Sequence, residues 1–312
     1  MTGRMSGHLA FDRLVHSDWS ANASKRWSAD AVRVSGGWRI ERIAQTPPEH
    51  AFLDELFGHG RGTLAGFDFP IGLPLVSLDR LGCGFREFLC SPQAPSFLEP
   101  AETLFGVSPM QPFYRKHPAG GRRADLLRAL ECSCFNELLR VCDRPTPYRS
   151  RAESIFWTVG AKQAGKAALA GWREILIPAL MRGAALWPFD GTLSDLQANA
   201  LTVAETYPAE AYQHIGMRRI IGKRTQAGRQ QGCAAIRAWA SKQRIAFSSD
   251  VEQMMRDGFG PRADGEDPFD ALAGLCGMIE VACGRRAEAP VTPPLSYPRE
   301  GWILGQIDLP TA

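Results

Sequence analysis

Three short, largely apolar runs along this chain each end in an acidic residue. The runs cover residues 14–17, 64–67 and 201–204, and they lead into Asp18, Asp68 and Glu205. Proline follows within three residues of the second and third acids. A short apolar run bounded by turn-forming residues is typical of a buried β-strand. The pattern therefore predicts three strands that each carry a carboxylate to the point where a loop begins.

Two further strands and a helix complete the beginning of the predicted fold. Residues 29–34 and 38–44 flank Gly36-Gly37, a pair that is typical of a tight hairpin turn. Residues 47–57 open with two prolines and repeat apolar side chains at helical spacing. The order of elements up to residue 74 is therefore β-β-β-α-β, and later helices are expected at 229–243, 250–256 and 267–284.

The middle of the chain has a different character. Residues 75–200 are rich in proline, glycine and helix-like segments, with helices expected at 126–141 and 162–177 and no strand predicted. A connection of this length is too long to be a plain loop in a compact domain. We therefore expect a helical insertion, or cap, at 75–200. The core around it would comprise 11–74 and 201–288, followed by a proline-rich tail at 289–312 with a last strand at 301–306.

These elements predict an α/β fold with one mixed sheet flanked by helices. Strands one, four and five would run parallel and the hairpin strands would add beside the first, which gives five strands in the order 3-2-1-4-5. Because this order reverses at the first strand, a crevice is expected at the carboxyl ends of strands one and four. Asp18 and Asp68 would lie there, with Glu205 on the neighbouring strand.

Composition narrows the class of protein. The 312 residues are 45% hydrophobic and 22% charged, which is typical of a globular protein with a substantial core. A net charge of +3 is compatible with a polyanionic partner but does not require one. The eight cysteines lack zinc-binding spacing, no signal peptide opens the chain, and no apolar stretch is long enough to span a membrane. We therefore expect a cytoplasmic protein with reduced cysteines and no membrane association.

A second acidic feature begins the last predicted helix. Asp267 and Asp270 are three residues apart and so lie on one side of the first helical turn. Hydrolysis of a phosphodiester by the two-metal route needs several carboxylates around Mg²⁺ or Mn²⁺, ions that prefer oxygen ligands. Asp18, Asp68, Asp267 and Asp270 would supply them. The alternative is structural, because Asp267 before Pro268 would cap the helix and Asp270 would favour its dipole.

Four segments carry the most distinctive motifs of the chain. They are HSDWSA at 16–21, GFDFPIGLP at 66–74, AETYPAEAY at 204–212 and DPFDALAGL at 267–275. Together they resemble an uncharacterised bacterial family, domain-of-unknown-function family 429, over most of the chain outside the leader and the tail. GFDFPIGLP is the most specific match. That family is grouped with predicted nucleases of the ribonuclease-H-like fold, which also begins β-β-β-α-β.

The resemblance also implies an acidic site, formed by Asp18, Asp68, Glu205, Asp267 and Asp270. In the Holliday-resolvase branch of the ribonuclease-H-like fold, acids on the first and fourth strands join a DxxDA pair on the last helix. This chain is similar to that layout, with Asp68 where the branch has a glutamate.

Basic residues supply candidates for binding a phosphate backbone. The densest basic cluster follows the third acidic strand, and a further lysine lies in the predicted insertion. The candidate substrate-binding residues are Arg218, Arg219, Lys223, Arg224 and Lys162. Nucleic-acid binding requires such side chains to neutralise phosphates. The alternative is that they are solvated charges on a loop and on an exposed helix face.

The predicted function is hydrolysis of phosphodiester bonds in nucleic acid, dependent on Mg²⁺ or Mn²⁺. Its catalytic residues would be Asp18, Asp68, Glu205 and Asp270. One alternative is a non-catalytic nucleic-acid-binding or regulatory module that retains the fold. Another is a nucleotide-dependent phosphotransferase, but the phosphate hairpins of such enzymes usually have glycine after the first acid, where this chain has Trp19-Ser20.

Overall fold

The chain folds into two compact units. The computed structural model describes residues 9–58, 62–116, 121–158, 163–217 and 222–310. The first unit comprises residues 1–68, 179–289 and 303–307, and the second comprises 69–178, 290–302 and 308–312. Each unit is described by itself below.

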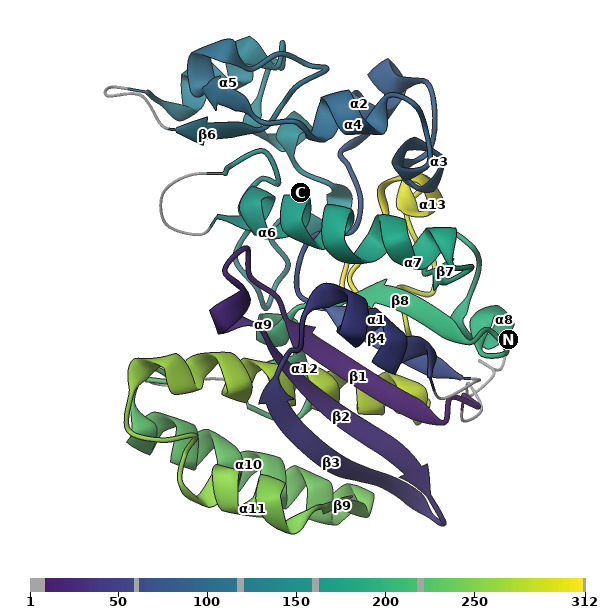
Figure 1. Cartoon of the computed structure of the whole chain (residues 1–312), viewed down its shortest axis with the longest axis vertical. Coiled ribbons are helices and arrows are strands. Elements are labelled where there is room, and N and C mark those ends of the chain that lie inside the picture. Colours follow the sequence, from purple (N-terminus) through teal and green to yellow (C-terminus); the bar gives the residue numbers. More distant parts are fainter. Residues whose placement is uncertain (1–8, 59–61, 117–120, 159–162, 218–221, 311–312) are drawn as a thin grey trace. The chain divides into compact units, whose positions relative to one another are not determined.

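A mixed seven-stranded β-sheet forms the centre of the first unit (Figure 1), with the strand order β7-β8-β4-β1-β2-β3-β9. The strands are β1 (Arg13–Asp18), β2 (Trp27–Val34), β3 (Gly37–Gln45), β4 (Thr63–Phe67), β7 (Ala185–Leu186), β8 (Leu201–Glu205) and β9 (Ile245–Phe247). β1 and β3 each pair antiparallel with β2, and the remaining pairs are parallel. The chain therefore has an α/β fold.

The predicted strands correspond to the adjacent strands β3-β2-β1-β4-β8 of this sheet. The sheet is larger than predicted, because β7 and β9 extend it at its two ends. β7 has two residues and β9 has three, so neither is long enough to show the alternation that identifies a strand in sequence. β7 also lies within 75–200, where the sequence predicts no strand.

Helices cover both faces of the sheet in the first unit (Figure 1). They are α1 (Glu49–Phe57), α8 (Leu193–Leu196), α9 (Pro208–His214), α10 (Gln226–Gln243), α11 (Ser249–Arg256) and α12 (Glu266–Ala282), with short 3-10 helices η1 (Ala23–Lys25) and η6 (Ala263–Gly265). α12 packs on β1, β2 and β3, while α1 packs on β4. The helices predicted at 47–57, 229–243, 250–256 and 267–284 are confirmed, with ends shifted by a few residues.

Small residues let α12 approach the sheet closely. A Cβ atom at Gly274 would lie 2.1 Å from Nε2 of His16, and one at Gly66 would lie 2.6 Å from Sδ of Met278. His16 is fully buried, and this burial lowers its pKa to about 3, so the imidazole is neutral. The helix rests directly on β1 and β4 because these two glycine positions carry no side chain.

The other face of the sheet carries an aromatic cluster beside α1. The Trp19 ring stacks on Phe52 with 6.3 Å between centroids, and Phe67 meets these two rings edge-on at 5.8 and 6.3 Å. Side chains alternate between the two faces of a strand. Because Trp19 and Phe67 point toward α1, Asp18 and Asp68 belong to the face that α12 covers.

The second unit is mainly helical and has an aromatic core. Phe113 contacts Phe97, Phe156 and Trp172 with centroid separations of 6.0, 5.8 and 6.2 Å. Its elements are α2 (Leu75–Leu81), α3 (Phe85–Leu89), α4 (Ala94–Leu98), β5 (Ala101–Thr103), η2 (Leu104–Gly106), β6 (Tyr114–Lys116), α5 (Arg123–Ala129), η3 (Phe135–Leu138), η4 (Val141–Asp143), α6 (Ala164–Gly171), the π-helical η5 (Trp172–Leu176) and α13 (Tyr297–Glu300). α7 (Ile177–Met181) continues from η5 across the boundary between the units.

Two expectations for this region are wrong. β5 and β6 form a parallel pair, although no strand is predicted there, because three-residue strands leave no periodic signal. The helix expected at 126–141 stops with α5 at Ala129, and Glu131 has the left-handed φ of 52° that ends it. The helix expected at 162–177 agrees in position with α6 and η5 over the described residues.

The boundaries of the units also differ from the predicted insertion. The long stretch of the second unit runs from residue 69 to residue 178. Residues 179–200 therefore belong to the first unit, which contains the sheet. The strand expected at 301–306 is reduced to one parallel bridge between Ile303 and Glu205. The tail thus contributes residues to both units.

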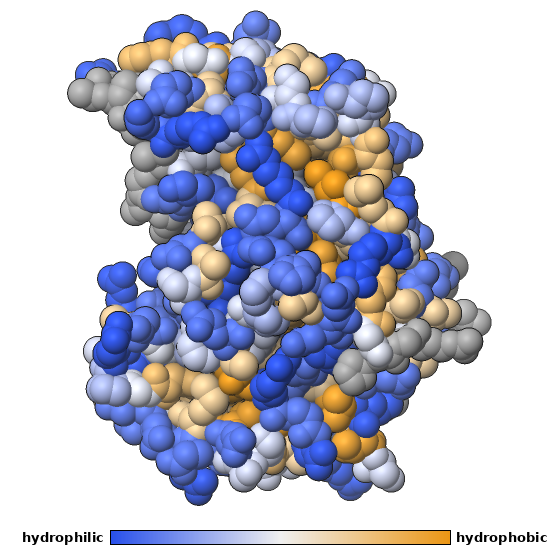
Figure 2. All heavy atoms as spheres, viewed as in Figure 1, coloured by the Kyte–Doolittle hydropathy of each residue, from blue (hydrophilic) through white to orange (hydrophobic). Residues whose placement is uncertain are grey.

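The face of the molecule seen in Figure 2 is mainly polar. Hydrophilic residues cover most of the face shown in Figure 2, and hydrophobic residues reach it in separate patches. Among the described residues, no helix is long and apolar enough to cross a membrane.

The contact between α12 and β1 gives a test of the fold. Alanine is a better helix former than glycine by about 1 kcal/mol. If position 274 had free space around it, Gly274→Ala would therefore stabilise the protein. Here we expect it to lower the free energy of unfolding in urea by roughly 1–3 kcal/mol, because the new methyl group meets the buried His16 ring. In a His16→Ala background the same change should cost little. An equal loss in both backgrounds would contradict this packing.

Candidate functional site

Strands β1 and β4 bring Asp18 and Asp68 into contact. Their parallel register pairs Ser17 with Phe67, so the next residue of each strand lies at the same edge of the sheet. The backbone N–H of Trp19 donates a hydrogen bond of 2.6 Å to Oδ1 of Asp68. The carboxyl groups of Asp18 and Asp68 also share a hydrogen bond. The two acids that the sequence places at neighbouring strand ends are therefore side by side.

Burial dominates the electrostatics of this pair. It raises the pKa of Asp18 well above the ordinary 3.8, and the charge of Asp68 adds to the rise. Burial also raises the pKa of Asp68 to about 6, although hydrogen bonds from Asp18 and from the Trp19 N–H act to lower it. Two charged carboxylates in contact repel each other. The pair therefore keeps a proton to a higher pH than an isolated aspartate would.

The N-terminal part of α12 adds Asp267 and Asp270 to the same face. α12 begins at Glu266 with Gly265 as its N-cap, so the structural alternative in which Asp267 caps the helix is wrong. The charges of Asp267 and Asp270 both contribute to the raised pKa of Asp18. All four aspartates predicted as metal ligands therefore lie close enough to act on one another.

The acids of α12 are themselves shifted. Burial raises the pKa of Asp267 to about 6, with Lys25 acting against the rise and Asp270 adding to it. Burial likewise raises the pKa of Asp270, while Lys223 and Tyr212 act against it. The cluster thus contains more carboxyl groups than its nearest cations, Lys223 and Lys25, can balance.

Lys223 and Tyr212 hold Asp270 from two sides. Nζ of Lys223 lies 2.6 Å from Oδ2 of Asp270 and 2.9 Å from Oε1 of Glu266, and the Tyr212 hydroxyl donates to Oδ1 of Asp270. Burial acts to lower the pKa of Lys223, but the two carboxylates outweigh it and the pKa is raised. Within the described part of the chain, Asp270 is the only one of the four aspartates in salt-bridge contact with a cationic side chain.

Glu205 ends β8 but faces away from these aspartates. It pairs in register with Phe67, and side-chain alternation puts both on one face of the sheet. Thr206 belongs to the other face, since its Cγ2 would lie 2.6 Å from a Cβ at Gly66. The strand register therefore does not bring Glu205 to the cluster.

The predicted substrate-binding residues have different fates. Arg218, Arg219 and Lys162 lie outside the described residues. Lys223 is turned into the acidic cluster rather than outward. Arg224 is exposed, with Nε 3.6 Å from Oε2 of Glu266, so it remains accessible to a ligand.

Arg229, which follows the same basic segment, has a structural role. It is fully buried and donates hydrogen bonds of 2.7–2.8 Å to four backbone carbonyl oxygens, those of Lys223, Gly258, Gly260 and Arg262. A guanidinium group engaged in this way positions two loop segments and is not available for a phosphate.

The role of Tyr212 is not predictable from local sequence. Tyr212 lies on α9, which packs on α12. A buried hydroxyl needs a hydrogen-bond partner, but its partner Asp270 is 58 residues away along the chain. Lys223 and Asp270 are likewise 47 residues apart. No spacing rule connects such pairs, so the sequence assigns Lys223 to substrate instead.

The cluster has the donor chemistry of a Mg²⁺ or Mn²⁺ site but not the finished arrangement. Carboxylate oxygens are the ligands that these ions prefer. Among the described residues, however, no group of three or more His, Cys, Asp and Glu side chains is arranged to hold one ion. The oxygens that would bind the metal already have partners. Those of Asp18 and Asp68 share a hydrogen bond, and those of Asp270 contact Lys223 and Tyr212. A metal ion would therefore have to replace these contacts.

Comparison with known proteins adds no assignment. No protein-family model, curated protein or solved structure matches this chain. The function must therefore be argued from the residues of the site.

The raised pKa of Asp68 predicts how stability depends on pH. Because the folded state keeps the proton up to about pH 6 and the unfolded state loses it near 3.8, stability falls as pH rises between these values. In EDTA at about pH 8, Asp68→Asn should therefore raise the free energy of unfolding by roughly 1–3 kcal/mol. The gain should vanish near pH 4.

Urea denaturation across this pH range measures the effect. The matched control is Asp250→Asn, at an exposed position in the first turn of α11, which should change stability by less than about 1 kcal/mol. If Asp68→Asn lowers stability at high pH, the charge at position 68 is not under the repulsion described here.

Removal of the Lys223 ammonium should lower the free energy of unfolding, whereas Asp68→Asn should raise it. Lys223→Met leaves the Asp270 carboxylate buried without its cation, and we expect a loss of about 2 kcal/mol in unfolding free energy at high pH. The loss should shrink as the pH falls, because a protonated Asp270 needs no counter-charge. Lys223→Arg retains the charge and should recover most of the stability. Equal stability of Lys223→Met and the parent at every pH would contradict the ion pair.

Proposed function

We propose that this chain hydrolyses phosphodiester bonds of nucleic acid with the help of Mg²⁺ or Mn²⁺. The ligands would be Asp18, Asp68, Asp267 and Asp270. The observation that carries the proposal is the surplus of buried and partly buried carboxylates at one strand edge, where Lys223 balances Asp270 and Lys25 acts on Asp267. Buried charges are normally paired or bind a metal.

The fold supports the same proposal. We infer that the sheet is ribonuclease-H-like, because the run β3-β2-β1-β4-β8 has the strand order expected for that class. Three of the four motifs that resemble family 429 fall on the two strand ends and the helix start that form the cluster, and the fourth, at 204–212, carries Tyr212. Glu205, which the resemblance also implies, is left out of the proposed ligand set because of its strand register.

A bound divalent cation would activate water for attack and stabilise the leaving oxygen. Other residues of the chain already hold two of the proposed ligands in position. The Trp19 N–H holds Asp68 in place, and Tyr212 holds Asp270. Lys223 is the residue we expect to change partner: once the carboxylates are balanced by the cation, its ammonium is left to contact a phosphate oxygen. The exposed Arg224 is a second candidate for that contact. Arg218, Arg219 and Lys162 are further candidates for contacts to phosphate.

A second candidate function is a non-catalytic nucleic-acid-binding or regulatory module. Two observations favour it. Lys223 already supplies an internal cation to Asp270 and Glu266, and the described residues contain no ready-made group of three metal ligands. In that case the acids would be a structural element and the cluster would bind no divalent ion.

The experiment compares metal binding and cleavage in matched variants. Calorimetric titration with Mn²⁺ measures binding. Cleavage is measured with labelled single- and double-stranded DNA and RNA as substrates. For the hydrolase we expect binding to the parent protein and a loss of cleavage of about a hundredfold or more in Asp68→Asn, because even the removal of an outer-shell partner costs tenfold to a hundredfold. Asp250→Asn should retain both activities.

Each outcome separates the candidates. Mn²⁺ binding that Asp68→Asn abolishes, together with cleavage, supports the hydrolase. No binding at millimolar Mn²⁺, or undiminished cleavage by Asp68→Asn, rejects it. Nucleic-acid binding without metal binding would favour the non-catalytic module.

A further inference from the structure

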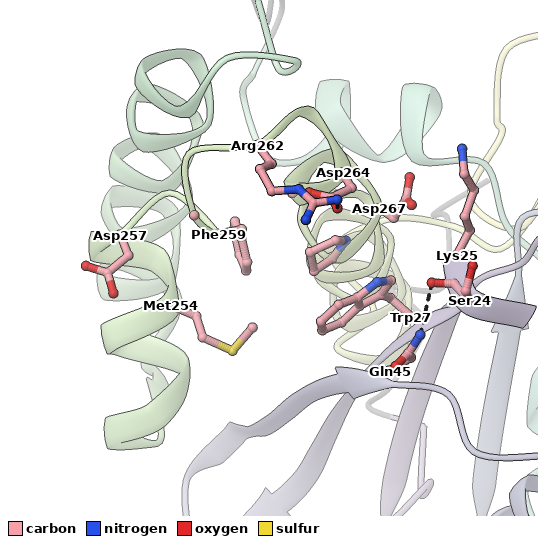
Figure 3. Close-up of a pocket in the computed structure, with 13 residues that line it drawn as sticks. Ser24, Lys25, Trp27, Gln45, Met254, Asp257, Phe259, Arg262, Asp264 and Asp267 are labelled. Carbon is pink, nitrogen blue, oxygen red and sulfur yellow. Dashed lines mark hydrogen bonds and ion pairs between the residues drawn. The ribbon is translucent and has the colours of Figure 1, made fainter.

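A cavity of about 650 Å³ opens in the first unit beside the acidic cluster. Its lining comes from η1, the adjoining ends of β2 and β3, the end of α11 and the segment that leads into α12. Figure 3 shows Met254 and Phe259 on one side of the cavity, and Trp27, Gln45 and Lys25 on the other. The volume is in the range of sites that bind small organic groups.

The walls of this cavity present flat apolar surfaces. Trp27 and Phe259 are each only partly buried, and Met254 and Pro268 complete the apolar lining. Aromatic side chains that stay half-exposed inside a cavity can stack on a planar ring, which gains from both apolar burial and π contact. The chemistry of the walls thus favours a planar aromatic group.

The backbone holds Phe259 in place against its own preference. Phe259 has a φ of 59°, in the left-handed region that a bulky residue rarely adopts. Arg229 donates to the carbonyl oxygens on either side of it, those of Gly258 and Gly260, and so fixes this conformation. The Phe259 ring also rests edge-on against Phe269, with 6.0 Å between centroids. A strained residue held by buried contacts is typical of a functional position.

Charged groups at the cavity connect it to the acidic cluster. Lys25 and Arg262 supply positive charge, and the exposed ion pair of Arg262 with Asp264 is weak enough for another anion to replace. Asp267 lines the cavity and also belongs to the cluster. A ligand with a flat ring in the cavity and a phosphate beside it would therefore reach the carboxylates through Asp267.

We propose that this cavity is a nucleobase-binding subsite, in which one base of the nucleic-acid substrate stacks on Trp27 and Phe259. The adjoining phosphate would then lie by Lys25, next to the carboxylates. The proposal rests on the hydrolase function only for this placement of the phosphate. Stacking is tolerant of base identity, since every base offers a π face. The subsite would hold the strand in register without reading its sequence.

The test measures binding of small probes in EDTA, so that hydrolysis plays no part. Calorimetry compares a nucleoside 5′-monophosphate with ribose 5-phosphate, which has the sugar and phosphate but no base. We expect the nucleotide to bind at least about tenfold more tightly, as removal of one base stack predicts. In Phe259→Asn this preference should disappear. Asparagine accepts a positive φ readily, so the variant should fold, which thermal unfolding checks.

Two further variants serve as controls. Phe259→Tyr keeps the ring and should bind the nucleotide within about twofold of the parent. Phe105→Asn removes an exposed phenylalanine that does not line the cavity and should change nothing. Equal binding of the two probes by the parent, or an unchanged preference in folded Phe259→Asn, would overturn the subsite.

The subsite and the hydrolase can fail separately. Base-dependent binding that Phe259→Asn abolishes supports the subsite even if no metal ion promotes cleavage. Cleavage that depends on Asp68 but shows no base preference in binding rejects the subsite and leaves the hydrolase standing.

Discussion

The close contact between Gly274 of α12 and the buried ring of His16 determines where the acids of this protein meet. Asp270 is one helical turn before Gly274, on the same side of α12. Asp18 is two residues after His16, on the same face of β1. Whatever fixes Gly274 over His16 therefore also fixes Asp270 over Asp18. The cluster depends on a glycine that carries no chemistry of its own.

This dependence explains which parts of the site were predictable. Asp18 and Asp68 each end a strand with a local signal, and parallel pairing of β1 and β4 follows from topology alone. The pair on α12 is visible as a spacing of three. Neither the inward turn of Lys223 nor the bond from Tyr212 has any such signal, because both partners are distant along the chain.

The elements of the fold also differ in whether the local sequence predicts them. The strands with a clear apolar run, and the long helices α10 and α12, are predicted at nearly the right positions. β7 and β9 are too short to carry a pattern, and they form because an existing sheet edge offers hydrogen bonds. β5 and β6 are equally short, but they pair with each other in a separate two-stranded sheet. Glu205 lies on a strand that is predicted correctly. The face of the sheet to which its side chain points was not predictable, because it depends on the register with Phe67.

The four carbonyl contacts of Arg229 have a thermodynamic consequence. One planar guanidinium ties the backbone at Lys223 to the backbone around Phe259. Lysine could not replace it, because an ammonium lacks the rigid fork that reaches several carbonyls at once. A ligand in the proposed subsite would therefore act on the same buried guanidinium that anchors the backbone of Lys223. If such a ligand altered the charge state of the acids, the charge state would by thermodynamic necessity alter the binding of the ligand to the same extent.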